Sequence, residues 1–355
     1  MEGHAKKPLD FAGEVRAIPG GENLERCYSC GTCVSTCMVQ QRLDPEFNPR
    51  RLLRLVMTGD REAAFRSPTT WLCSGCDLCF PACPQKIHIS QVIGAVKRLA
   101  VEAGQASPLK AALVDKAACF ACGTCVEVCP YEAVSLVSGQ VSISDPVATG
   151  AELKVEKKYA CVDPNLCMGC GICAASCLAS CITPEKSTDK KIEAQARTHA
   201  HREWSPRLAV FVCDWSVRPE TDQALLTDPP HGVHVVRVPC SGRVTPTFLV
   251  AALQKGFDGV LVIGCRPGEC HFKQGNMVEQ ARLSLAGSFL DLLGLEEKRL
   301  RFEWMPTGSR GELAGLFDGM LGELRGLGPI AWRPELDPPV RGPKHGVKTP
   351  HPKLG

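Results

Sequence analysis

The sequence lacks the features of a membrane or secreted protein. None of its 355 residues belongs to an unbroken apolar run of the ~18 residues that a transmembrane helix needs. The most apolar stretch, from Phe248 to Gly264, is interrupted by Gln254, Lys255 and Asp258. The N-terminal segment MEGHAKKPLD has no apolar core of a secretory signal. We therefore expect a cytoplasmic protein without a transmembrane segment.

Strong net charge and the common catalytic motifs are also missing. The formal net charge is only +3, which predicts no nucleic-acid partner. Neither G-x-G-x-x-G after a strand nor G-x-x-x-x-G-K-[ST] occurs, and no Ser/His/Asp or paired-carboxylate arrangement is visible. No two cysteines are adjacent, as they are in disulfide-cleaving cluster sites. Since no place for two-electron chemistry is visible, we expect a carrier and not a catalyst.

Cysteine, by contrast, is abundant, at 22 residues. In a chain without a visible secretory signal, so many thiols are more typical of metal ligands than of disulfides. Sixteen of them form four copies of Cys-x2-Cys-x2-Cys-x3-Cys, arranged in two pairs. The copies are Cys27-Cys30-Cys33-Cys37, Cys73-Cys76-Cys79-Cys83, Cys119-Cys122-Cys125-Cys129 and Cys167-Cys170-Cys173-Cys177.

This motif is the bacterial pattern for 4Fe–4S clusters, in which the fourth cysteine of a run binds the cluster of the paired run. Pro84 and Pro130 follow the fourth cysteine as in that pattern, whereas Met38 and Leu178 replace the proline in the other runs. Structural zinc is the alternative, but zinc does not need the third cysteine of each run. We assign the four 4Fe–4S clusters to Cys27, Cys30, Cys33 and Cys83; to Cys73, Cys76, Cys79 and Cys37; to Cys119, Cys122, Cys125 and Cys177; and to Cys167, Cys170, Cys173 and Cys129.

Periodicity predicts different folds around the two pairs. Apolar residues between Leu52 and Met57, and again between Ile89 and Leu99, recur at helical spacing, so the first pair is expected to be α-helical. In the second pair, the runs 133–137 and 140–144 flank Ser138-Gly139. This pattern predicts a short β-hairpin turning at the glycine, within a compact two-cluster module of β-hairpins and short helices.

The pattern of apolar residues changes again from Arg207. The β-rich runs Leu208–Cys213, Val233–Cys240 and Gly259–Cys265 alternate with amphipathic stretches at Thr247–Lys255 and Met277–Leu293. This alternation predicts an α/β domain with a parallel sheet. The whole chain is therefore expected to be multidomain α+β. The predicted divisions are 1–108 (α-helical, two clusters), 109–185 (two-cluster module), 186–206 (linker or exposed helix), 207–330 (α/β domain) and 331–355 (disordered, proline-rich tail).

Four further cysteines, Cys213, Cys240, Cys265 and Cys270, lie at strand ends or in a loop of the α/β domain. Loops at the carboxyl ends of parallel strands converge on one crevice. Four thiols there suit a 2Fe–2S cluster or a zinc ion, and their spacing does not separate the two. Buried inert cysteines are a third interpretation. His271, beside Cys270, is a weaker candidate ligand.

Four residues near these motifs are interpreted as having no part in metal binding. His231 and His234 flank a predicted strand and are assigned to the surface or to packing. Cys161 and Cys181 lie just outside the fourth motif and are interpreted as small apolar side chains beside a cluster. Ligand substitution by one of these two cysteines is the alternative.

The segments CDW (213–215), VPCSGRV (238–244) and GFDGVLVIGCRPGECHFKQGN (256–276) strongly resemble the delta subunit of methyl-viologen-reducing, F420-non-reducing hydrogenase. The resemblance covers about residues 205 to 330. In that family four cysteines bind a 2Fe–2S cluster, so the resemblance favours 2Fe–2S over zinc. The matching residues are Cys213, Cys240, Cys265 and Cys270.

The segments GENLERCYSCGTCVSTC and WLCSGCDLCFPACP resemble the C-type subunit of heterodisulfide reductase, over about residues 10 to 105. That resemblance implies an α-helical ferredoxin fold with two 4Fe–4S clusters. The middle domain resembles a bacterial two-cluster ferredoxin, as found in the A-type subunit of the same enzyme. The fusion of all three is a departure from these separate subunits.

Together these resemblances imply an electron-transfer subunit of a heterodisulfide-reductase-like, flavin-based electron-bifurcating complex. The implied partners are a flavoprotein like the A-type subunit of heterodisulfide reductase, a protein like its B-type subunit, and a donor of the hydrogenase or formate dehydrogenase type. A stand-alone disulfide or quinone reductase is the alternative, and it would need Cys161 or Cys181 to open a cluster site. A redox or iron sensor is less favoured, because no DNA-reading motif or basic patch is visible.

Overall fold

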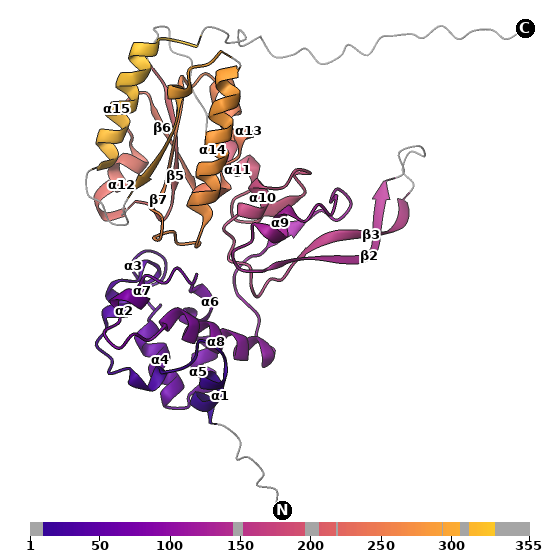
Figure 1. Ribbon diagram of the computed structural model, residues 1–355, viewed down its shortest axis with the longest axis vertical. Coiled ribbons are helices and arrows are strands. Elements are labelled where there is room, and N and C mark those ends of the chain that lie inside the picture. Colours follow the sequence, from indigo (N-terminus) through magenta and orange to yellow (C-terminus); the bar gives the residue numbers. More distant parts are fainter. Residues whose placement is uncertain are drawn as a thin grey trace, which may run out of the picture.

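The computed structural model describes residues 10–144, 152–195, 206–217, 219–292, 294–305 and 312–330. Figure 1 shows three folded parts. The helical part (residues 10–108) and the sheet part (206–330) lie at opposite ends, and the middle part (109–185) lies beside their junction. Within these described residues, no helix is both long and apolar enough to cross a membrane. The predicted tail at 331–355 lies outside the described residues.

The helical part contains no strand, as its sequence predicts. Its core joins Leu52, Leu53 and Val56 to the buried face of the last helix. The helix that carries those leucines begins at Pro49, where the side chain of Asn48 accepts a hydrogen bond from the backbone of Arg51 and caps the first turn. The elements are α1 (Phe11–Ala17), η1 (Leu24–Arg26), α2 (Thr32–Ser35), α3 (Met38–Arg42), α4 (Pro49–Met57), α5 (Arg61–Arg66), α6 (Pro68–Leu72), α7 (Cys79–Ala82) and α8 (Ile89–Glu102).

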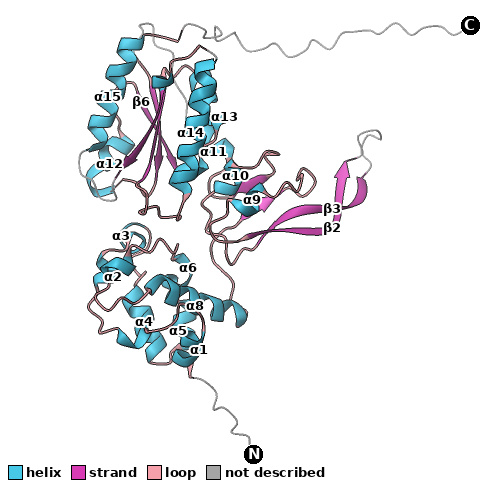
Figure 2. Ribbon diagram, in the orientation of Figure 1, coloured by secondary structure: helices cyan, strands magenta, loops and turns pink. Residues whose placement is uncertain are grey.

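The middle part has two antiparallel two-stranded sheets, one short and one long, and two one-turn helices. Its elements are β1 (Ala112–Val114), α9 (Thr124–Glu127), β2 (Val134–Ser144), β3 (Glu152–Val162), α10 (Ile172–Ala175) and β4 (Ile182–Pro184). Strand β1 pairs with β4, so the start of the middle part is held to its end. Strands β2 and β3 form a long ribbon that projects from the body of the molecule (Figure 2).

The predicted turn at Ser138-Gly139 is wrong. Strand β2 runs straight through Gly139, which pairs with Lys157 of β3. Tyr159 covers this position so closely that a β-carbon on Gly139 would come within 3.1 Å of the phenol oxygen. The glycine therefore admits a neighbouring side chain in a strand and does not serve a turn.

The sheet part confirms the predicted parallel sheet and adds a strand that the sequence pattern missed. The strand order is β6-β5-β7-β8, with every neighbouring pair parallel. The sequence pattern did not predict β8, because Arg301 and Glu303 alternate with its apolar residues. These two side chains are half-buried at the sheet edge, where they pair with each other. The elements are α11 (Asp189–Gln195), β5 (Leu208–Cys213), α12 (Pro219–Thr227), β6 (Val233–Val238), η2 (Ser241–Arg243), α13 (Pro246–Gln254), β7 (Gly259–Cys265), α14 (Gly275–Leu292), η3 (Glu297–Arg299), β8 (Leu300–Met305) and α15 (Glu312–Leu327).

Helices cover both faces of this sheet (Figure 1). One face packs against α11, α13 and α14, and the other against α12 and α15. Strands β5 and β7 are buried along their whole length, which explains their continuous apolar runs. The carboxyl ends of the strands point toward the helical and middle parts, so the loops that follow them face the other two parts of the chain.

Candidate metal centres

The four Cys-x2-Cys-x2-Cys loops share one backbone shape. In each loop the residue before the second cysteine has a positive φ: Ser29 (62°), Gly75 (64°), Ala121 (54°) and Gly169 (71°). The residue after the second cysteine is also left-handed in every loop. Two such residues in one short loop curl the chain, so that its three thiols face a common centre.

The structure brings together the thiols of the first pair of motifs in two crossed groups. Site 1 comprises Cys27, Cys30, Cys33 and Cys83, and these four residues line one pocket. Site 2 comprises Cys73, Cys76, Cys79 and Cys37. Burial first, and then the charges of neighbouring site 1 thiolates, raise the pKa of Cys33 to about 11. The same causes raise the pKa of Cys79, whose nearest charged neighbours are the other three thiols of site 2.

The second pair of motifs is crossed in the same way. Site 3 comprises Cys119, Cys122, Cys125 and Cys177, and site 4 comprises Cys167, Cys170, Cys173 and Cys129. Cys125 has the other three site 3 thiols as its charged neighbours, and Cys173 has those of site 4. The site 4 cysteines also line one pocket together.

The four cysteines of the sheet part converge as site 5, beyond the carboxyl ends of β5, β6 and β7. Cys213 and Cys265 end their strands, and Cys240 lies two residues beyond β6. All four are buried. Hydrogen bonds from Cys240 and Cys265 lower the pKa of Cys213, and the same two partners lower that of Cys270. The four thiols therefore lie close to one another around one centre.

The chemistry of these sites fits iron–sulfur clusters. All 22 cysteines are free thiols, so none is committed to a disulfide. Backbone N–H groups donate to ligand sulfurs at 3.4 Å, from Ala121 to Cys119 and from Ala133 to Cys129. Such donors stabilise sulfur carrying negative charge, as in a cluster thiolate. Within the described stretches of chain, no three His, Cys, Asp or Glu side chains form a group that could hold a single metal ion. A cluster spreads its thiols around several iron atoms and does not require such a group.

The remaining candidate residues lie beside these sites. His271 is buried, its ring stacks on Trp215 at 3.4 Å, and its Nδ1 is 3.2 Å from the hydroxyl of Ser74. His234 packs edge-to-face on Phe257, while His231 is exposed. Cys161 is exposed on β3.

Cys181 is buried close to site 3. Its sulfur is 3.4 Å from that of Cys177, and its backbone N–H also donates to Cys177 at 3.4 Å. Burial first, and then contact with Cys177, raise the pKa of Cys181 to about 12. It is therefore a buried neighbour of a site 3 thiol.

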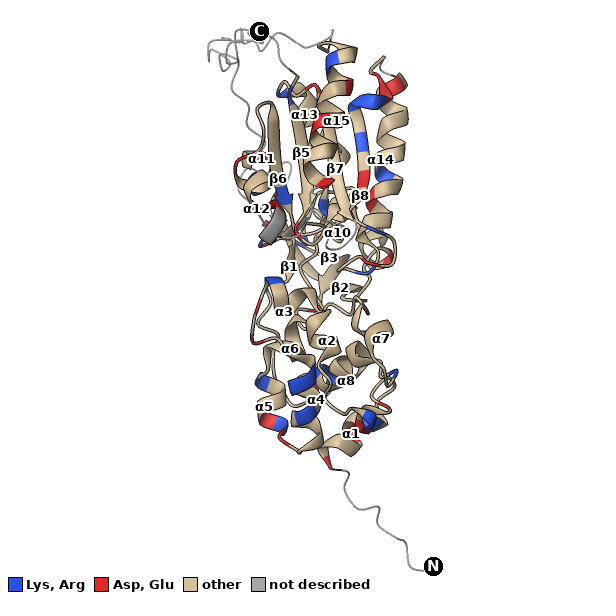
Figure 3. Cartoon of the chain, turned by 90° about the vertical axis from the view of Figure 1, so that its left-hand side faces the viewer, with Lys and Arg blue, Asp and Glu red and all other residues tan. Residues whose placement is uncertain are grey.

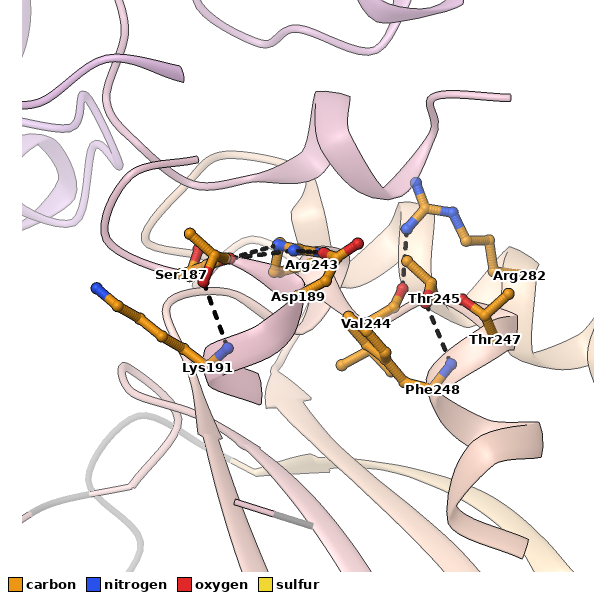
Figure 4. Close-up of polar contacts among 10 residues, drawn as sticks. Ser187, Asp189, Lys191, Arg243, Val244, Thr245, Thr247, Phe248 and Arg282 are labelled. Atoms are coloured by element: carbon orange, nitrogen blue, oxygen red, sulfur yellow. Dashed lines mark hydrogen bonds and ion pairs between the residues drawn. The ribbon is translucent and has the colours of Figure 1, made fainter. Parts of the chain in front are cut away.

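Residues that link the middle part and the segment after it to the sheet part were missed by the sequence analysis. Arg243, in η2, is fully buried; it donates to the carbonyl of Ser187 at 3.0 and 3.2 Å and pairs with Asp189 (Figure 4). Arg282 of α14 donates to the carbonyl of Val244 at 3.2 Å and to the hydroxyl of Ser176, beside α10. Arg282 thus clamps the middle part onto the loops of site 5, while Arg243 packs beside Gly171 of the site 4 loop and holds the segment that follows the middle part. No local pattern marks them, because their partners lie far away in the sequence.

Several stretches of the chain match models of known protein families. Residues 208–328 match the family model "methyl-viologen-reducing hydrogenase, delta subunit". Two 4Fe–4S dicluster models match residues 23–87 and 72–133, and a 4Fe–4S binding model matches 164–180.

Several relatives are subunits of redox complexes. The D-type iron–sulfur subunit of F420-non-reducing hydrogenase from Archaeoglobus profundus is 43% identical over 131 residues, which is 36% of this chain and 95% of that protein. The A-type subunit of the ferredoxin/F420H2-dependent CoB-CoM heterodisulfide reductase from Methanosarcina acetivorans is 32% identical over 56% of this chain and 29% of its own length. The C-type subunit of the H2:CoB-CoM heterodisulfide,ferredoxin reductase from Methanothermobacter marburgensis is 31% identical over 28% of this chain and 52% of its own length.

The chain thus spans less than a third of the Methanosarcina protein and about half of the Methanothermobacter protein. It covers nearly all of the hydrogenase subunit. The chain therefore belongs to the methyl-viologen-reducing hydrogenase delta-subunit family, and it is an iron–sulfur electron-transfer protein related to subunits of heterodisulfide reductase.

Proposed function

We propose that this chain is a non-catalytic subunit that relays single electrons within a heterodisulfide-reductase-like, flavin-based electron-bifurcating complex in the cytoplasm. In this proposal sites 1 to 4 each hold a 4Fe–4S cluster and site 5 holds a 2Fe–2S cluster. The proposed partners are a donor of the hydrogenase or formate dehydrogenase type, a flavoprotein like the A-type subunit of heterodisulfide reductase and a protein like its B-type subunit. The proposed domains are 1–108, 109–185 and 207–330.

One observation carries the proposal: twenty thiols from distant parts of the chain gather in five groups of four. When bound, iron–sulfur clusters supply centres that accept and release one electron at a time. The thiols hold those centres in place, and apolar neighbours shield sites 2, 4 and 5 from water. Core residues of all three parts pack around site 5 as one apolar cluster, which keeps the sites close together.

Iron and acid-labile sulfide analysis of anaerobically purified full-length chain tests this assignment. We expect about eighteen irons per chain, with EPR signals of both cluster types after reduction. Stoichiometric zinc, or far fewer irons in a well-folded preparation, would contradict it. Co-purification of the native complex and identification of its subunits tests the proposed partners.

A further inference from the structure

Site 5 lies between two other sites. The apolar cluster around it includes Cys73 of site 2 and Cys170 of site 4, together with the site 5 cysteines. In sequence order site 5 comes last, after site 4, and far from site 2. The fold places it instead where the three parts of the chain meet (Figure 3).

A hydrogen bond joins the site 5 loop to the site 2 loop. His271 follows the site 5 ligand Cys270, and Ser74 follows the site 2 ligand Cys73. Their side chains meet at 3.2 Å in a buried contact, and the stacked Trp215 ring holds the imidazole in place. This contact thus joins the residue after a site 2 thiol to the residue after a site 5 thiol.

Tyr131 occupies the corresponding place between site 5 and site 4. Its hydroxyl is buried and has no hydrogen-bond partner among the described residues. Lys273, three residues after Cys270, lies 5.1 Å from the Tyr131 ring and donates to the carbonyl of Pro130 at 3.1 Å. A buried hydroxyl without a protein partner is costly, so it indicates an acceptor supplied by something bound there.

The residues around Tyr131 show which sites it lies beside. Tyr131 packs against the apolar cluster around site 5 and against the cluster that contains thiols of sites 3 and 4. Tyr131 and Lys273 also line a cavity of about 270 Å³ together with Cys73 and Ser74 of the site 2 loop.

Close backbone packing also brings the loops of sites 4 and 5 together. A β-carbon on Gly242 would come within 2.7 Å of the carbonyl of Gly275 and 3.1 Å of Ile172, in the site 4 loop. A β-carbon on Gly275 would collide with the Cys240 sulfur. Small residues here allow the site 4 loop to approach the site 5 thiols.

We propose that site 5 is the junction of the relay and not its end, coupled to site 2 through the Ser74–His271 bridge and to site 4 through Tyr131. This inference rests on the proposed function. One electron given up at one site is taken up at the next, so no bond forms or breaks and no further reactant is needed. The two routes then end at sites 1 and 3, where Cys30 and Cys122 are exposed.

EPR spectroscopy of the full-length, anaerobically purified chain tests the junction. We expect the spin relaxation of the site 5 signal to become faster in two separate steps of a redox titration. One step should come when site 2 becomes paramagnetic, and the other when site 4 does, because a nearby paramagnetic centre speeds relaxation. Tyr131→Phe, which removes only the hydroxyl, should lower the midpoint potentials of sites 4 and 5. Ser74→Ala should shift sites 2 and 5 and leave site 4 unchanged. Tyr159→Phe, the same chemical change elsewhere in the middle part, is the matched control and should shift none of them.

Two results would overturn the junction. One is a site 5 signal that relaxes as an isolated spin in every redox state. The other is an unchanged midpoint potential of site 5 in both Tyr131→Phe and Ser74→Ala. If the iron content is full in these samples, either result contradicts the junction alone and leaves the relay standing. A preparation without the iron contradicts both proposals.

Discussion

Sites 1 and 3 differ from sites 2 and 4, although all four are built on one motif. The outer sites have an exposed cysteine, Cys30 or Cys122, whereas no cysteine of the inner sites is exposed. Large aromatic side chains also point to solvent in the outer loops, where Tyr28 is 59% and Phe120 76% exposed. The inner loops carry Ser74 and Met168 at these positions.

The same contrast appears in the residues that touch the second thiol. Thr32 and Thr124 lie 3.3 and 3.6 Å from Cys30 and Cys122, and hydrogen bonds from these threonines lower the pKa of both thiols. Leu78 and Ile172 take the place of threonine in sites 2 and 4. There burial dominates: it raises the pKa of Cys76, and it raises the pKa of Cys170 to about 12. One loop geometry thus serves both a surface site and a buried site, and its neighbours decide which.

The largest effect is expected from breaking the clamp that buries site 4. Arg243→Ala removes a fully buried side chain and leaves the carbonyl of Ser187 without its donor. We expect a loss of about 2–4 kcal/mol of stability. A lower thermal midpoint and faster proteolysis between the middle and sheet parts would report it. Arg98→Ala, which breaks the exposed pair with Glu102, is the control and should change stability by less than about 1 kcal/mol. Equal effects of the two variants would contradict a structural role for the clamp.

A matched pair of glycines separates packing from backbone strain. Gly123 in site 3 and Gly171 in site 4 occupy the same motif position, with φ of 85° and 80°. A β-carbon on Gly123 meets nothing within 4 Å, whereas one on Gly171 collides with Arg243. Gly123→Ala should cost about 1–2 kcal/mol for the left-handed backbone alone, and Gly171→Ala should cost more. Thermal unfolding and iron content measure both. A larger loss in Gly123→Ala would show that site 4 is less tightly packed than the structure indicates.

The smallest effect is expected at the outer threonines. Thr32→Val and Thr124→Val remove a donor to an exposed thiol, so the potentials of sites 1 and 3 should fall by on the order of 20 mV. Redox titration followed by EPR measures the change. Thr32→Ser and Thr124→Ser keep the hydroxyl and should restore the original values. If the valine variants keep their potentials, hydrogen bonding by threonine does not distinguish the outer sites from the inner sites.

Local structure could largely be predicted where the signal was strong and short-range. The helix at Pro49 has its cap and its apolar stripe within one stretch of sequence, and the buried strands β5 and β7 have continuous apolar runs. The β2–β3 ribbon was harder to predict. Ser138-Gly139 is typical of a turn, but Gly139 lies inside strand β2 and pairs with β3. Strand β8 was missed because its half-buried charged residues hide the alternation.

The sequence by itself determined which three thiols each Cys-x2-Cys-x2-Cys loop can present, because two-residue spacers keep them in one short loop. It also predicted the parallel sheet, through the continuous apolar runs of its strands. Only the tertiary structure decided that site 5 lies between sites 2 and 4, that Tyr131 has a buried unpartnered hydroxyl, and that Arg243 and Arg282 hold the middle part and the segment after it in place. These contacts join residues 50 or more positions apart, and their stability comes from burial and hydrogen bonding that exist only after the parts have packed.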